Sequence, residues 1–328
     1  MKLASLKSVN SLDGDLVVIA KDLKSFARAG SVIPNLREAV ENWEKVEPKL
    51  ADIYRQLNSG SYPKSEKVTD EKIFHSALPR TWLFADGSAF IHHIKLVRQA
   101  RKAALPETLL TVPLMYQAES GKFLAPTENI PQRDFSHGTD FEAEVGVIVD
   151  YVPMGITPEK ALEHIKLIVL INDVSLRGLI PEELAQGFGF FQSKPNKSLS
   201  PVAITPDELG EAWKNGRVEL PLDVRFNSQF FGKANAKEMH FHFGQLIAHA
   251  ARTRDLAAGS LIGSGTVSNE DASMGSSCIA EVRVLEQINN GEIKTSFMKE
   301  NDTIEIEMKN KSGESIFGRI FQTVKKIN

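Results

Sequence analysis

The sequence has few features of secreted, membrane or nucleic-acid-binding proteins. Cys278 is the only cysteine, which excludes an internal disulfide and suits a reducing compartment. No apolar run approaches the roughly 18 residues that a membrane-spanning helix needs, and the start of the chain has no apolar segment typical of a signal peptide. The 39 lysines and arginines are scattered among 42 acidic residues, so no basic patch points to nucleic acid or to an anionic membrane. We therefore expect a cytoplasmic protein whose partner is a small molecule.

The chain divides into a short and a long part. With 328 residues, 42% of them hydrophobic, it can bury a large core. Residues 1–30 alternate short apolar runs with turn residues, which indicates a small sheet of hairpins. Residues 36–57 carry an apolar stripe at helical spacing that Pro48 interrupts, which predicts two helices or one kinked helix. The polar stretch 58–72 is typical of a linker, so we expect a small N-terminal domain at 1–72 and a larger domain at 73–328.

The larger part is predicted to be rich in strands. Apolar runs near 145–149 and 167–171 indicate buried strands. The stretches 220–232, 278–298 and 303–320 resemble β-hairpins, the last two with turns at Asn290-Gly291 and Ser312-Gly313. Helices are expected after the histidines at 92–93, from Thr157, from Thr205 and at 240–259, ending at Gly259. Together these patterns predict an α+β, β-rich fold.

Two acidic residues in one strand are the most informative feature of the sequence. Glu142 and Glu144 lie two residues apart in a valine-rich run, so both side chains point to the same face of the strand. Asp173 ends the second apolar strand. Buried carboxylates at close range need a cation or a shared proton, and a hard divalent cation prefers such oxygen ligands. The alternative is that the pair lies on the solvated face of an edge strand, and spacing alone favours neither interpretation.

Further polar residues complete a plausible acid–base set. His93 follows Asp86 by seven residues in a segment with few other polar groups, although a histidine on an apolar helix face more often packs than reacts. Arg177, Lys194 and Glu281 supply charges of both signs. Cys278 has no neighbour in sequence that would activate it, so we interpret it as a small buried apolar residue.

Several ordered motifs resemble one known family. The segments ADGSAFIHH, FEAEVGV, LINDVSLR, FFQSKP with SLSP, and GSGTVS are similar to the fumarylacetoacetate hydrolase family, closest to its bacterial branch. The resemblance covers about residues 77–328. It implies a mixed β-roll as the larger domain, a homodimer, and a bound Mg²⁺ or Ca²⁺, with Mn²⁺ as a third cation that accepts oxygen ligands.

The resemblance also assigns roles to individual residues. It implies a histidine base with a glutamate partner, an arginine and a lysine that stabilise charge, substrate-binding residues, and four carboxylate ligands for the metal. These are His93 and Glu281 for the base pair, Arg177 and Lys194 for charge, Tyr116, Thr266 and again Arg177 for substrate, and Asp86, Glu142, Glu144 and Asp173 for the metal. One departure is Ile180, where the animal enzymes carry a glutamine.

The function implied is hydrolysis of the C–C bond of a β-diketone. The expected reaction turns fumarylacetoacetate and water into fumarate and acetoacetate, in tyrosine and phenylalanine catabolism. Alternatives on the same scaffold are acylpyruvate hydrolysis, oxaloacetate decarboxylation and isomerisation of a hydroxydienedioate. A water-activating His–Glu pair favours hydrolysis over decarboxylation. A non-catalytic metal-binding scaffold is the alternative from another class of protein.

Overall fold

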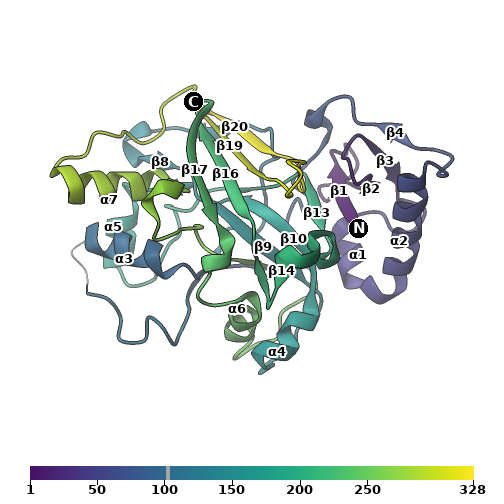
Figure 1. The fold of residues 1–328 in the computed structure, drawn as a ribbon, viewed down its shortest axis with the longest axis horizontal. Helices are drawn as coiled ribbons and strands as arrows, with labels where there is room; N and C mark the ends of the chain where they lie inside the picture. The colour runs from purple at the N-terminus through teal and green to yellow at the C-terminus, as the bar shows by residue number, and fades with distance from the viewer. Residues whose placement is uncertain (101–103) are drawn as a thin grey trace.

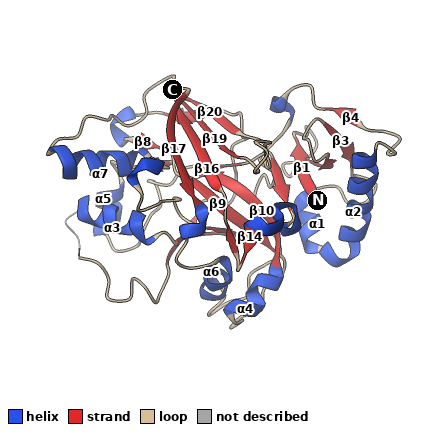
Figure 2. Cartoon of the chain, in the orientation of Figure 1, coloured by secondary structure: helices blue, strands red, loops and turns tan. Residues whose placement is uncertain are grey.

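The computed structural model describes residues 1–100 and 104–328. Two β-sheets cross the middle of the molecule, and helices gather at its two ends (Figure 1). Helices α1 (Leu36–Glu41) and α2 (Trp43–Ser59) lie beside the N-terminal strands, whereas α3 (Ile91–Ala100), α5 (Ile180–Ala185) and α7 (Ile279–Asn290) lie at the opposite end (Figure 2). The predicted α+β, strand-rich class is therefore confirmed. Within the described ranges, no helix combines the length and apolar character needed to cross a membrane.

The larger sheet has eleven strands and reaches from the N-terminal segment to the acidic strands. Its members are β1 Lys2–Leu6, β2 Asp15–Ile19, β3 Ser25–Arg28, β4 Glu66–Lys67, β5 Phe84–Ser88, β6 Leu114–Ala118, β9 Ala143–Val149, β10 Ile165–Asn172, β12 Ser198–Leu199, β13 Val202–Ile204 and β18 Leu261–Gly263. The order is β4-β3-β2-β1-β13-β10-β9-β18-β5-β6, and β12 pairs with β10. Because β1 pairs antiparallel with β13, the N-terminal hairpins continue the same sheet.

The smaller sheet has five strands in the order β17-β16-β19-β20-β7. Its members are β7 Ile130–Gln132, β16 Pro221–Phe226, β17 Gln229–Asn235, β19 Thr303–Met308 and β20 Ile320–Lys326. Two short pairs, β8 Thr139–Asp140 with β11 Ser175–Leu176 and β14 Trp213–Lys214 with β15 Arg217–Val218, and two helices, α4 Pro158–Ala161 and α6 Phe243–Ala250, complete the fold. The hairpin predicted at 220–232 is present as β16 and β17. In the stretch 303–320 the first predicted strand is β19, but its partner β20 begins only at Ile320, so the second strand lies after the predicted one.

Strands β9 and β10 are buried on both faces, which explains their continuous apolar sequences. Val145 and Val147 pack into one hydrophobic core together with residues of the smaller sheet. Ile148 and Val169 pack into a second core, with the apolar faces of α1 and α2. Glu144 on β9 and Glu142 just before it are buried between neighbouring strands, so the interpretation of this pair as part of a solvated edge strand is wrong.

The stretch 278–298 is not the hairpin that the sequence predicts. Residues 279–290 form helix α7, and Gly291 ends it in the left-handed conformation with φ 76°. Val282 and Val284 alternate with polar residues as in a strand, but Ile279, Glu281 and Val284 form the buried face of a helix. The Asn290-Gly291 pair, a frequent hairpin turn, here serves as a helix C-terminus.

Three helix boundaries also differ from prediction. The break near the first helices lies at Asn42, and Pro48 sits inside α2 on its exposed side, where water can satisfy the carbonyl that proline leaves unpaired. Helix α6 ends at Ala250 and does not reach Gly259. The segment after Thr205 is a 3₁₀ turn without a side-chain cap. The predicted basic end of α3, at 101–102, lies outside the described residues.

Candidate active site

Four consecutive strands of the larger sheet, β10, β9, β18 and β5, bring three carboxylates together. Asp86 lies on β5, Glu144 on β9, and Asp173 follows the last residue of β10. Strand β18 separates β5 from β9, and its Gly263 pairs with Asp86 on one side and Gly146 on the other. A Cβ on Gly263 would lie 2.2 Å from Asp86 Oδ1, so only glycine leaves room for this carboxylate. The backbone of the sheet thus fixes the positions of acids that are distant in sequence.

The three carboxylates fit a hard divalent cation. One oxygen from each of Asp86, Glu144 and Asp173 lies within 4.8 Å of the others, and all three residues are buried. Both oxygens of Glu144 are shielded from water and lack a hydrogen-bond partner among the described residues. An ionised carboxylate buried in this way is costly unless a cation compensates it. A donor set made only of carboxylate oxygens is the type that Mg²⁺, Ca²⁺ and Mn²⁺ accept.

The pKa values of the acids reflect their different neighbours. Burial, reinforced by the charge of Asp173, raises the pKa of Asp86 to about 8. Burial and the nearby Asp86 also raise the pKa of Glu144 well above its ordinary value. Burial disfavours ionisation of Glu142 too, but Arg177 and Lys194 hold its pKa well below the ordinary value. Positive charge from the protein is therefore directed at Glu142, and the Asp86–Glu144 side of the cluster has the greater need for an added cation.

Glu142, the fourth predicted ligand, lies in ion pairs beside the cluster. Its Oε1 accepts a hydrogen bond from Arg177 Nη2 at 2.7 Å, and its Oε2 accepts one from Lys194 Nζ at 2.5 Å. Lys194 Nζ also donates to Asp173 Oδ2 at 2.6 Å. The arginine and lysine that the sequence singled out thus lie directly against the predicted metal ligands, and the ligand role of Glu142 stays a prediction.

His93 and Glu281 form a pair at the contact of α3 and α7. His93 Nδ1 lies 2.8 Å from Glu281 Oε1, and both residues are buried. Because Nδ1 is engaged by the carboxylate, the opposite ring nitrogen, Nε2, is the one left to exchange protons. Cys278 lies within 4.8 Å of both side chains, and burial raises the pKa of its thiol well above the ordinary value. The cysteine is therefore a neutral neighbour of the pair.

Two buried residues near the site were not identified from the sequence. Asp140 accepts hydrogen bonds from Arg177 Nε at 2.9 Å and from the backbone N–H groups of Ile279 and Ala280, so it fixes the N-terminus of α7. It lies two residues before Glu142, so the same alternation of acids could have revealed it. Lys197 is fully buried, and its Nζ lies 3.0 Å from Asp173 Oδ1. Lys197 follows Lys194 by three residues, and this spacing does not by itself indicate a buried lysine beside Asp173.

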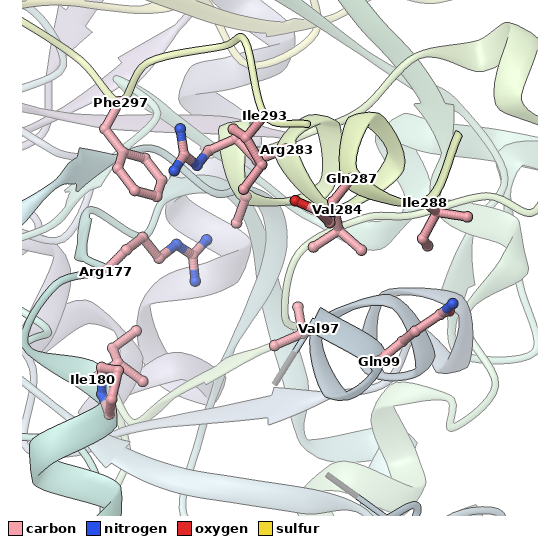
Figure 3. A pocket seen from close by; sticks show the side chains of 12 residues that line it. Val97, Gln99, Arg177, Ile180, Arg283, Val284, Gln287, Ile288, Ile293 and Phe297 are labelled. Carbon is pink, nitrogen blue, oxygen red and sulfur yellow. The ribbon is translucent and has the colours of Figure 1, made fainter. Parts of the chain in front are cut away.

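Eight of the ten predicted site residues line a cavity of about 450 Å³. Among its wall residues are Asp86, His93, Tyr116, Glu142, Glu144, Arg177, Lys194 and Thr266. Tyr116 donates its hydroxyl to Asp173 Oδ2 at 2.8 Å. Glu281 lies behind His93, outside the cavity wall. The structure therefore brings all the predicted site residues to one cavity or directly beside it. A second cavity of about 650 Å³ adjoins it, and Arg177 and Ile180 line both (Figure 3).

Comparison with known proteins agrees with this arrangement. The family described as Fumarylacetoacetate (FAA) hydrolase C-terminal matches residues 83–325. The chain belongs to the fumarylacetoacetate hydrolase family. A second family description, Fumarylacetoacetase N-terminal domain 2, matches residues 1–80. The resemblance noted from the sequence motifs is therefore confirmed, and the chain is an enzyme of this family.

Relatives within the fumarylacetoacetate hydrolase family are distant. The chain is 27% identical over 160 residues to a 2,4-didehydro-3-deoxy-L-rhamnonate hydrolase of a Sphingomonas species, which covers 48% of this chain and 53% of that protein. The chain thus spans about half the length of the curated relatives it matches. The chain also superposes on two solved structures, with 100% of each pair of chains covered. One is fumarylacetoacetate hydrolase from Exiguobacterium antarcticum (TM-score 0.67, 18% identity), and the other is maleylpyruvate hydrolase from a Sphingobium species (TM-score 0.66, 13% identity). They establish the shared fold.

Proposed function

We propose that this protein hydrolyses the C–C bond of a β-diketo acid, with fumarylacetoacetate as substrate and fumarate and acetoacetate as products. The observation that carries this proposal is the buried His93–Glu281 pair, whose histidine lines the same cavity as the three-carboxylate cluster. Hydrolysis needs a base for water beside a polarised carbonyl group, whereas decarboxylation needs no base for water.

The residues have distinct tasks in this reaction. Asp86, Glu144 and Asp173 would hold the divalent cation, which when bound polarises the diketone carbonyl. His93, oriented through Nδ1 by Glu281, takes a proton from the attacking water at Nε2. The water oxygen bonds to the carbonyl carbon, and the C–C bond breaks with its electron pair leaving as an enolate. His93 then returns the proton to the enolate carbon.

Lys194 and Arg177 supply positive charge at the cavity wall. Lys194 is buried between Glu142 and Asp173, and Arg177 lies between Asp140 and Glu142. Ion pairs on two sides hold each cation in one position before substrate arrives. Preorganised cations of this kind stabilise negative charge that develops on the carbonyl oxygen or is present in a substrate carboxylate.

A second candidate is hydrolysis of an acylpyruvate or a related 2,4-diketo acid. The names of two similar proteins support it: a 2,4-didehydro-3-deoxy-L-rhamnonate hydrolase, and maleylpyruvate hydrolase, one structure of which is a complex with manganese(II) and pyruvate. This reaction would use the same base pair and carboxylates and differs only in the substituents on the diketone.

The test is turnover by the purified protein with Mg²⁺ and with excess EDTA. Fumarylacetoacetate, acetylpyruvate and oxaloacetate would be supplied separately, and the loss of each substrate followed by its ultraviolet absorbance. We expect metal-dependent loss of fumarylacetoacetate with fumarate as product. Turnover of acetylpyruvate alone would select the second candidate, and decarboxylation of oxaloacetate without either hydrolysis would overturn the proposal.

A further inference from the structure

The cavity of about 650 Å³ beside the catalytic cavity has no role in the reaction described above. Val97, Arg177 and Ile180 line both cavities, so the two share a wall. The remaining wall comes largely from α7 and from the segment that follows it (Figure 3). The second cavity therefore lies directly beside the catalytic one, and an arm of a substrate bound at the carboxylate cluster would reach it by passing Arg177.

Arg283 provides a positive charge in the second cavity. Its guanidinium donates through Nη1 to the carbonyl oxygen of Thr295 and lies 4.2 Å from the centre of the Phe297 ring. Among the described residues, no carboxylate lies within ion-pair distance of it. Glu286, one turn further along α7, instead accepts hydrogen bonds from the segment at Lys294 and Thr295. Arg283 is thus held in position and keeps N–H groups for an anion.

Arg177 differs from Arg283 in this respect. Its Nε donates to Asp140 and its Nη2 to Glu142, so two carboxylates already balance its charge. A carboxylate entering the second cavity would therefore find at Arg283 a guanidinium that no carboxylate of the described residues contacts at ion-pair distance. A guanidinium recognises a carboxylate in a planar, two-pronged arrangement, which gives orientation as well as attraction.

The rest of the wall is mostly apolar. Val97, Val284 and Phe297 line the cavity, and Ile288 and Ile293 expose 46% and 45% of their surface there or at its rim. Ile180 on the shared wall offers no hydrogen-bonding group to a passing chain. An occupant that suits this surface is a carbon chain along the isoleucines and valines that ends in an anion at Arg283.

We propose that the second cavity is a subsite for an acidic arm of the substrate: a carbon chain, saturated or unsaturated, whose terminal carboxylate pairs with Arg283. The inference rests on the proposed function, because it places the reacting diketone in the catalytic cavity. It adds the place where the second carboxylate of such a diketo acid binds, and it implies that binding is tightest when this carboxylate lies at a set distance from the reacting carbonyl. Arg283 is then a residue that determines specificity and takes no part in the chemistry.

Binding of unreactive analogues tests the subsite without requiring turnover. The Mg²⁺-loaded protein would be titrated by calorimetry with 2-oxoadipate, 2-oxopimelate and 2-oxosuberate, each beside the 2-oxo monocarboxylic acid of equal length. These acids lack the 4-oxo group and are not cleaved. At one chain length we expect the dicarboxylate to bind about 10- to 100-fold more tightly than its monocarboxylate partner, the range expected for a charged hydrogen-bonded pair.

Variants locate the source of that preference. Arg283→Met should abolish the difference between the paired acids, and Arg254→Met, which changes an exposed arginine outside both cavities, should leave it unchanged. Ile288→Glu, at a half-exposed position, adds a negative charge that repels the ligand carboxylate, so it should also remove the preference. Because this variant keeps Arg283, it tests the subsite even if Arg283→Met misfolds. Equal binding of the paired acids at every length, or a preference that survives Arg283→Met, would overturn the inference. Absence of diketone hydrolysis, by contrast, would count against the proposed function alone.

Discussion

His93 and Glu281 are 188 residues apart in the sequence, and His93 Nδ1 lies 2.8 Å from Glu281 Oε1. They come from two helices that pack together at one end of the molecule, α3 and α7 (Figure 1). The hydrogen bond fixes the ring of His93 and leaves Nε2 as the nitrogen that Glu281 does not engage, and His93 lines the cavity that also contains Asp86 and Glu144. A base oriented by a buried carboxylate is a common arrangement for activating water.

Replacing His93, the proposed base, should reduce turnover and leave metal binding intact. We expect His93→Ala to lower kcat by about 10²- to 10⁴-fold, the usual contribution of general-base catalysis. Glu281→Gln should lower it less, because the amide oxygen can still accept a hydrogen bond from Nδ1. His92→Ala, one residue away and outside the cavity wall, is the matched control. Equal activity of the His93 and His92 variants would remove His93 from the mechanism.

Glu144 should account for much of the stability gained from metal. A cation that binds only the folded protein stabilises it by about 2.7 kcal/mol at a concentration 100 times its Kd. In Glu144→Gln the neutral amide replaces a carboxylate of the three-acid cluster, so most of this Mg²⁺-dependent rise in Tm should disappear. Thermal unfolding with and without Mg²⁺ measures the effect. The exposed Glu270→Gln should retain the full rise, and retention by both variants would place the cation elsewhere.

Gly263 should be intolerant of even one added methyl group. In Gly263→Ala the new Cβ would meet Asp86 Oδ1 at 2.2 Å, and it would also lie 3.0 Å from a ring atom of Phe84. Asp86 must then move, so we expect a loss of Mg²⁺ affinity by at least about tenfold, measured by calorimetry. Gly30→Ala, with no heavy atom within 4 Å of the new Cβ, should bind Mg²⁺ as wild type does. Unchanged affinity in Gly263→Ala would show that Asp86 is not a ligand.

Lys2 should make stability depend on pH in the alkaline range. Its Nζ donates to the carbonyl of Ile316 at 2.9 Å, and burial lowers its pKa to about 8. Lysine in an unfolded chain keeps its proton to about pH 10.4. Between these values the unfolded state holds more protons, so the contribution of Lys2 to the free energy of unfolding rises with pH.

Urea unfolding of wild type and Lys2→Met at several pH values isolates this contribution. The free energy of unfolding of wild type should increase relative to that of the variant between about pH 8 and pH 10, because only wild type carries the titrating group. Lys45→Met, at an exposed position on helix α2, should run parallel to wild type over the same range. A wild-type curve parallel to Lys2→Met would mean that Lys2 is not perturbed.

Local sequence was sufficient for the strands that carry the acids. The apolar residues around Glu144 and before Asp173 predicted buried strands, and both strands are covered on two faces. Buried acids on such strands were then recognisable as candidate ligands. The spacing of Glu142 and Glu144 did not show that Glu142 pairs with Arg177 and Lys194, since those partners come from other parts of the chain.

Helix α7 was beyond local prediction for a physical reason. Its alternating valines and the Asn290-Gly291 pair satisfy the local rules for a hairpin. The helix is favoured by contacts that no local pattern contains: Asp140 accepts the N–H groups of Ile279 and Ala280, and α3 packs along its side. Because the sequence did not predict this helix, it also did not predict that Arg283 lines the second cavity.

Helix α7 also allows the choice of substrate to change, in evolution or in design, while the reacting groups stay in place. Its first turn carries Glu281 toward His93, while Arg283, Val284 and Ile288 form the wall of the neighbouring cavity. The carboxylate cluster lies on strands of the sheet and shares no residue with this helix. Substitutions from position 283 onward can therefore alter which acids are accepted while the reacting groups keep their places. A graft of 283–297 from a relative with another substrate is the most economical way to change the preference of this scaffold.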